Sequence, residues 1–242
     1  MSAQARQPRL WPILLATLIG TAILVTLGVW QVQRLQWKEA LLAQLAANAA
    51  AAPIDLATAA ARAAAGEDME FVRVSFPATY RHEGMIKMLA TYQGGQGWTI
   101  ITPATSSDGF AVIIDRGRIP DQQLDGFDKP GGLVQIDGVL RGYGRGRAMF
   151  DPDNDARANL WYWWDVPAML AAGGLAPELK PFPFVVQLLP AAAAAAFPRP
   201  EEPKAKLANN HLGYAITWFG LAATLLAVAG VYLSGLRKTR RA

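Results

Sequence analysis

The sequence of 242 residues contains no cysteine and only two histidines, His82 and His211. Without cysteine the chain forms no disulfide, binds no metal through thiolate and attaches no haem covalently. Two histidines are too few for an ordinary multi-histidine metal site. A fold outside the reducing cytosol must therefore hold together without cross-links.

Charged residues are also scarce, at 17% of the chain against ~25% in a typical soluble domain. The deficit lies in two uncharged runs, Leu10 to Trp30 and Leu212 to Leu236. As helices they would be ~31 and ~37 Å long, enough for the hydrocarbon core of a bilayer. They predict transmembrane helices at 10–30 and 212–236, a domain at 31–210 between them, and short tails at 1–9 and 237–242.

Acidic residues are absent from both ends, because all 19 lie between Glu39 and Glu202, whereas six basic residues lie in the tails. This positive-inside pattern predicts two cytoplasmic termini and an extracytoplasmic middle, and it explains the basic composition without nucleic acid binding. A cleaved signal peptide is the competing interpretation. Residues 28–33 (GVWQVQ) offer large side chains where cleavage needs small ones, so we expect an uncleaved anchor.

The middle of the chain predicts an α+β domain. The first helix should continue to Ala52, before Pro53, and Asp55 should cap a second helix that ends near Gly66. From Glu70 onward, short β-prone runs predict a mostly antiparallel sheet or barrel-like domain, with a short helix at 167–172. The expected strands are 71–80, 85–92, 98–103, 110–115, 133–140, 160–164 and 184–189.

His211 opens the second uncharged run, NNHLGYAITWFGLA, and is the leading candidate for a functional residue. Tyr214 and Trp218 fall on its helical face, and an imidazole beside an aromatic wall suits an apolar planar cofactor such as a haem. Alternatively, these residues are ordinary interfacial anchors and Asn209 or Asn210 caps the helix.

The first uncharged run ends in LGVWQVQRLQWK, residues 27–38. Here Gly28 allows close packing, Trp30 and Trp37 suit the membrane interface, and Arg34 and Lys38 can reach lipid headgroups. Small residues, at Ala16 and Gly20 in one run and Gly220 and Thr224 in the other, predict that the two helices pack against each other.

Other polar motifs predict structure rather than catalysis. Asp115-Arg116-Gly117 should end a strand in a turn with an ion pair, and His82 beside Glu83 should lie in a solvated turn. The segment RGYGRGR, 141–147, lacks the Lys-Ser/Thr and the following helix of a phosphate-binding loop. Residues 160–164 should point two aromatic pairs to opposite faces of a strand. Because no catalytic triad or carboxylate pair is evident, we do not expect an enzyme.

Together, LGVWQVQRLQWK and NNHLGYAITWFGLA resemble the signature of the Surfeit-locus family of cytochrome c oxidase assembly factors. Between them, GWTIITPA (97–104), VIIDRGRIP (112–120) and PDN…WYWWD (152–165) resemble that family in order and spacing, so the resemblance covers about residues 27–233. The chain departs from the family at Arg118, where an aromatic residue usually follows Arg-Gly.

This resemblance implies a non-catalytic chaperone of a bacterial inner membrane that serves a haem-copper oxidase. It implies that haem a is bound with His211 as an iron ligand, beside Tyr214 and Trp218, and is passed to oxidase subunit I. Haem a synthase and the lipid bilayer are further implied partners. The rival hypothesis is a cofactor-free membrane scaffold that stabilises an oxidase assembly intermediate through protein contacts.

Overall fold

The computed structural model describes residues 10–143, 147, 149–190, 196–203 and 210–239. The chain divides into two compact units, Met1–Ala43 with Lys206–Ala242, and Gln44–Ala205. The expected tail 1–9, residues 240–242 of the expected tail 237–242, and the proposed cap Asn209 lie outside the described residues. Each unit is described by itself.

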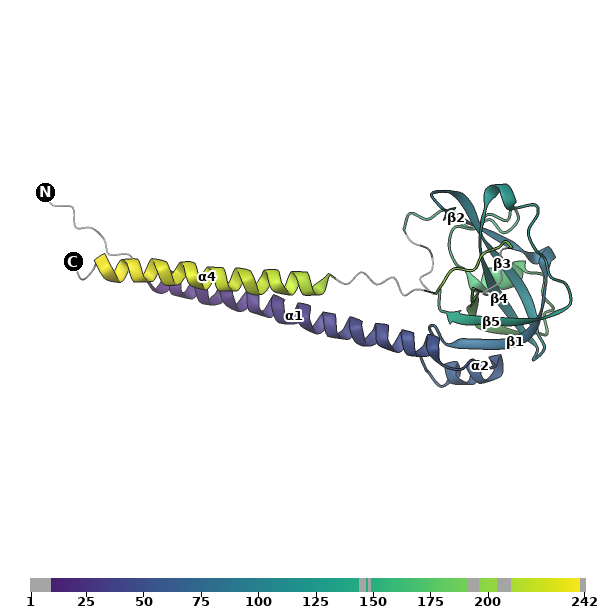
Figure 1. The fold of residues 1–242 in the computed structure, drawn as a ribbon, viewed down its shortest axis with the longest axis horizontal. Helices are drawn as coiled ribbons and strands as arrows, with labels where there is room; N and C mark the ends of the chain where they lie inside the picture. Colours follow the sequence, from purple (N-terminus) through teal and green to yellow (C-terminus); the bar gives the residue numbers. More distant parts are fainter. Residues whose placement is uncertain (1–9, 144–146, 148, 191–195, 204–209, 240–242) are drawn as a thin grey trace. The chain divides into compact units, whose positions relative to one another are not determined.

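The first unit contains two long helices side by side, most of α1 (Trp11–Ala50) and α4 (His211–Thr239) (Figure 1). Trp11–Ala50 and His211–Leu236 are long and apolar enough to be candidate membrane spans. Helix α1 continues well past the uncharged run, as its composition predicts, and ends at Ala50, shortly before Pro53.

The second unit is a six-stranded mixed sheet that closes into a barrel-like form. Its strand order is β1-β5-β6-β4-β3-β2, and β1 also pairs with β3, which joins the two sides of the sheet. All pairs are antiparallel except β4 with β6, which is parallel. The strands are β1 (Arg73–Tyr80), β2 (Ile86–Tyr92), β3 (Gly95–Ser106), β4 (Phe110–Pro120), β5 (Leu133–Arg141) and β6 (Lys180–Leu188).

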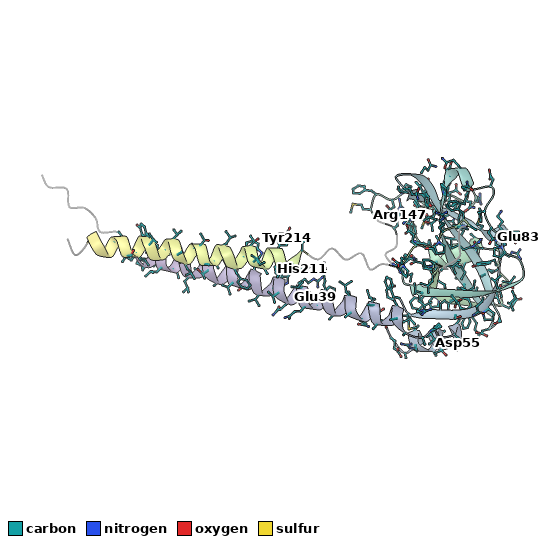
Figure 2. The ribbon with its side chains drawn as sticks, viewed as in Figure 1. Glu39, Asp55, Glu83, Arg147, His211 and Tyr214 are labelled. Atoms are coloured by element: carbon teal, nitrogen blue, oxygen red, sulfur yellow. The ribbon has the colours of Figure 1, made fainter. Side chains whose placement is uncertain are left out.

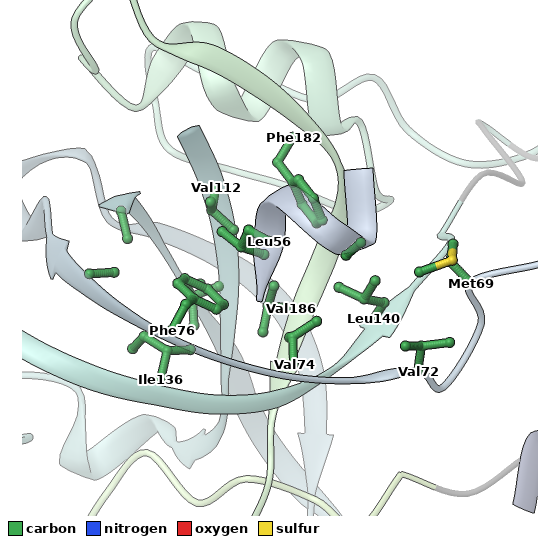
Figure 3. Packing of buried hydrophobic residues seen from close by; sticks show 14 residues of the cluster. Leu56, Met69, Val72, Val74, Phe76, Val112, Ile136, Leu140, Phe182 and Val186 are labelled. Carbon is green, nitrogen blue, oxygen red and sulfur yellow. The ribbon is translucent and has the colours of Figure 1, made fainter. Parts of the chain in front are cut away.

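Strand β4 is buried on both faces, which explains its continuous apolar run. Val112 and Ile114 belong to the main core with Phe76 and Phe182, whereas Ile113, between them, belongs to a second cluster. Helix α2 (Leu56–Ala64) adds Leu56 to the main core (Figure 3). Helix α3 (Val166–Ala172) covers the second cluster.

Helix α2 begins at the predicted cap. The Thr58 backbone N–H donates to Asp55 Oδ1 at 2.7 Å, and this hydrogen bond lowers the pKa of the Asp55 carboxyl. After the helix, Gly66 adopts a positive φ of 85°.

Residues 160–164 do not form the predicted strand. Asn154 Oδ1 accepts hydrogen bonds from the backbone N–H groups of Tyr162 and Trp163, so side-chain contacts take the place of a strand ladder. The alternation expected of a strand is also lost. Trp161 is buried in the second cluster, and Trp164, which the alternation places on the opposite face, packs against the same cluster and stacks on Tyr143 with ring centroids 4.1 Å apart.

Candidate functional site

His211 is the first residue of α4 and contacts α1 through a polar side chain. Its Nδ1 lies 2.6 Å from Gln31 Oε1, across 180 residues of sequence. Gln31 is a buried polar residue within a helix that is a candidate membrane span. Figure 2 labels His211 on the first turn of α4, beside α1.

This contact determines the chemistry of the imidazole. An amide oxygen only accepts hydrogen bonds, so Nδ1 carries the proton and Nε2 of the neutral ring carries a lone pair. His211 Nε2 is buried and has no hydrogen-bond partner among the described residues. A buried nitrogen with a free lone pair fits an axial ligand of haem iron. The described residues contain no cluster of three or more His, Asp or Glu side chains that could hold a metal ion in another way.

Tyr214 and Trp218 follow His211 at helical spacing. The side chain of Trp218 is half-buried, whereas Tyr214 is 55% exposed. Between them, Ala215 is buried at the helix contact. The Tyr214 N–H donates to the Asn210 carbonyl as part of the first helical turn. The two aromatic side chains therefore lie close in sequence to the imidazole and offer apolar surface.

Basic and aromatic residues of α1 follow Gln31. The Arg34 guanidinium lies 4.0 Å from the centre of the Trp37 ring, and the side chains of Trp30 and Trp37 are about half exposed. The charges of Arg34 and Lys38 act electrostatically on the His211 imidazole. The end of the uncharged run thus places two cations near the candidate ligand.

The two helices pack through glycines of α1, but only in part as predicted. A Cβ on Gly28 would lie 2.7 Å from the Phe219 ring, and one on Gly20 would lie 3.1 Å from Leu225 Cδ2. In contrast, Gly220 faces open space, and Ala16 and Thr224 are exposed. Ala215 and Ala222 are the buried small residues of α4. The predicted role of Ala16, Gly220 and Thr224 is therefore wrong, because these residues point away from the contact.

Sequence reasoning missed Gln31. The signal was present, because Gln31 follows Gly28 at i+3 on the same face and is a polar residue in a stretch long enough to span a bilayer. A polar side chain in such a position normally requires a partner. The identity of that partner depends on the pairing of α1 with α4.

The Asp115-Arg116-Gly117 motif lies within β4 and not in a terminal turn. Asp115 Oδ1 accepts from the Gly117 N–H at 2.9 Å, and the Arg116 guanidinium donates to the Asp128 carbonyl at 2.7 Å. Both side chains are buried, and no ion pair joins them within the described part of the chain. The predicted ion pair is wrong because each side chain bonds to a backbone group instead of to the other, while Arg116 Nη1 is buried without a hydrogen-bond partner among the described residues. Burial raises the pKa of Asp115 to about 6.

Arg118, the departure from the family pattern, attaches a later segment to the barrel. Its backbone exchanges two hydrogen bonds with Arg199, both at 2.9 Å, and its guanidinium lies 3.2 Å from Glu201 Oε2. Gly117 has a φ of 101°, and a Cβ there would collide with the Arg199 carbonyl. The pair Gly117–Arg118 therefore permits close backbone contact with residues 199–201.

The basic segment 141–147 is partly structural. Arg141 Nε lies 2.8 Å from Glu70 Oε1, and the Gly142 N–H donates to Glu70 Oε2 at 2.6 Å. Arg141 also donates to Gln187 Oε1 at 2.6 Å. Residues 144–146 lie outside the described residues. Arg141, the first arginine of the segment, therefore bonds to Glu70 and Gln187 and has a structural role in the barrel.

His82 is not in a solvated turn. It begins the short helix η1 (His82–Gly84), its Nε2 lies 2.8 Å from the Pro130 carbonyl, and its ring lies 5.5 Å from that of Tyr80. The prediction was wrong because the loop that contains Pro130 covers the histidine. His82 lies in the second unit, whereas His211 lies in the first.

Comparison with known proteins agrees with these motifs. The model of the SURF1 family matches residues 18–223. A SURF1-like protein of Monosiga brevicollis is 30% identical over 218 residues, which cover 84% of this chain and 80% of the relative. Surfeit locus protein 1 of Xenopus tropicalis is 27% identical, covering 82% and 68%, and that of Homo sapiens is 26% identical, covering 81% and 69%. The chain therefore belongs to the SURF1 family.

Proposed function

We propose that this chain is a membrane-anchored assembly factor for a haem-copper cytochrome c oxidase, which holds haem a and aids its insertion into subunit I. Its family is known in general for cytochrome oxidase assembly, which supports the wider role. In this proposal the role is non-catalytic, because holding haem and passing it on forms and breaks no covalent bond of the cofactor. The two candidate spans anchor the chain in a bacterial inner membrane with both termini in the cytoplasm.

The observation that carries the haem proposal is the buried, unpartnered His211 Nε2. This nitrogen would hold the iron of a bound haem as a ligand. Trp218 and Tyr214 would offer apolar surface to the macrocycle, and the charges of Arg34 and Lys38 would suit its propionates. A single imidazole ligand, without covalent attachment, suits a cofactor that must be released again.

The test compares three forms of the full chain, each co-expressed with haem a synthesis and purified in detergent. The wild type should show a Soret band, and His211→Ala should lose most of it because the Fe–N bond is removed. His82→Ala is the matched control and should keep the wild-type spectrum, since His82 belongs to the other unit. A full, unshifted Soret band in His211→Ala would remove this residue from the mechanism.

The alternative is a cofactor-free scaffold that stabilises an assembly intermediate. Its support is an exposed apolar pair in the second unit, Met149 at 87% and Phe150 at 93% exposure. Such exposure is typical of side chains that a partner protein covers. If this function holds, wild type and both histidine variants contain no haem, while Met149→Ser with Phe150→Ser weakens recovery of oxidase subunits with the chain.

A further inference from the structure

We infer that Gln31 is a positioning residue for haem iron: it holds the His211 ring in the Nδ1–H tautomer and thereby directs the Nε2 lone pair to the ligand site. This inference rests on the proposed function, because it assigns a role around the same imidazole. Gln31 is not proposed as a haem ligand. It acts through a side-chain contact between α1 and α4.

The first argument is the choice of tautomer. A free neutral imidazole in water favours the proton on Nε2, which would leave the buried Nε2 of His211 unable to bind iron. The acceptor oxygen of Gln31, 2.6 Å from Nδ1, reverses this preference. Within the His211 ring, Nδ1 therefore donates to Gln31 Oε1, and Nε2 keeps the lone pair for the iron.

The second argument is orientation. His211 begins α4, where one side of the helix has no preceding turn to restrain the ring. Gln31 is buried and lies one helical turn beyond Gly28, which is in close contact with Phe219. The glycine contact sets the spacing of the helices, and the glutamine then sets the rotation of the imidazole. Outer-sphere hydrogen bonds of this kind tune the basicity of histidine ligands in metal proteins.

A purely structural role makes a different prediction. If Gln31 only joined two helices, its loss would weaken their association without changing the iron–nitrogen bond of any haem that remained bound. If it positions the ligand, its loss changes the tautomer in the absence of haem and the strength of that bond in its presence. Two spectroscopic measurements therefore separate the roles.

The variants are Gln31→Leu, which keeps the approximate volume and removes the acceptor, and Gln31→Glu, which keeps an acceptor oxygen. Gln33→Leu is the matched control, because Gln33 is exposed on the same helix. All are made in the full chain and purified in detergent. Gln31→Glu keeps the test valid if Gln31→Leu inserts poorly.

The first measurement is ¹⁵N NMR of the haem-free, histidine-labelled chain at pH ~8.5, where an imidazole with the reference pKa of ~6.5 is neutral. Only two histidines contribute, and His82→Ala identifies the signals of His211. Wild type, Gln31→Glu and Gln33→Leu should show the Nδ1–H tautomer, and Gln31→Leu should revert to Nε2–H. A wild-type His211 with its proton on Nε2 would overturn the inference directly.

The second measurement uses haem a titration and resonance Raman spectroscopy of the ferrous iron–histidine stretch. Gln31→Leu should bind haem ~10–100-fold more weakly and lower the stretching frequency, whereas Gln31→Glu should bind well and raise it. Wild-type affinity and frequency in Gln31→Leu overturn the positioning role while leaving the proposed function intact. If wild type and all variants bind no haem, the proposed function fails first, and the positioning role fails with it.

Discussion

The clearest energetic consequence of the structure concerns Asp115, a buried carboxyl in β4. Its side chain is 7% exposed, and burial raises its pKa to about 6 from the ordinary value of 3.8. The Gly117 N–H and the charges of Arg141 and Arg118 act in the opposite direction without cancelling the effect of burial. The folded state therefore binds this proton more tightly than the unfolded chain does.

The sign of the pH dependence follows from that difference. Asp115 contributes its full stability below pH ~4 and loses it as pH rises through about 6, because ionisation then favours the unfolded chain. The whole effect is ~3 kcal/mol at 1.36 kcal/mol per pH unit. Of this stability, ~2 kcal/mol is lost between pH 4.5 and 7.5. The remaining ~1 kcal/mol is already lost at pH 4.5, because the carboxyl of the unfolded chain is largely ionised there.

The test is Asp115→Asn, whose amide oxygen can still accept from Gly117 but does not ionise. The free energy of unfolding is measured by urea titration of the detergent-solubilised chain, followed by the fluorescence of tryptophans such as the buried Trp161. The free energy of unfolding of the variant, relative to that of wild type, should be ~2 kcal/mol higher at pH 7.5 than at pH 4.5. The exposed Asp108 provides the control Asp108→Asn. Equal differences at the two pH values, within ~0.5 kcal/mol, would refute the reasoning about Asp115.

Two further predictions concern the anchors. Gly28→Leu should weaken the pairing of α1 with α4 by ~1–3 kcal/mol, because its side chain would collide with Phe219, whereas Gly220→Leu faces open space and should not. Cysteines introduced at positions 20 and 225 report the pairing by crosslink yield in this otherwise cysteine-free chain, and equal yields in the two variants would contradict the prediction. For topology, reporters fused at both termini should be active in the cytoplasm and one fused at Gly66 should report the outside; cytoplasmic activity at Gly66 would overturn the orientation.

Several features could be predicted from the sequence because their causes are local. Two uncharged runs are long enough to span a bilayer in any tertiary context, so the candidate spans follow from composition. Asp55 caps α2 through a residue three positions on, and the β-prone runs correctly located six strands, although the predicted bounds of β3, β4 and β6 were too short. The terminal motifs were sufficient to indicate the family that the comparisons then established.

Features that depend on distant partners could not be predicted from the sequence. The pattern of residues 160–164 suits a strand, but Asn154 satisfies their backbone groups and the ladder does not form. The Asp115-Arg116 pair suggests an ion pair, yet burial within β4 directs the two charges to separate backbone partners. The parallel pairing of β4 with β6 likewise joins strands that β5 separates in the chain, so it is set by the tertiary fold.

The candidate site shows the same division. The sequence alone singled out His211 as a candidate, because placing an ionisable side chain at the start of an uncharged, membrane-length run costs free energy. Only the tertiary structure paired it with Gln31, 180 residues earlier in the chain, and left its Nε2 buried without a partner among the described residues. Helical periodicity determines which face a side chain occupies, but the neighbour on that face is determined by the packing of α1 against α4, where small residues such as Gly28 allow the close approach.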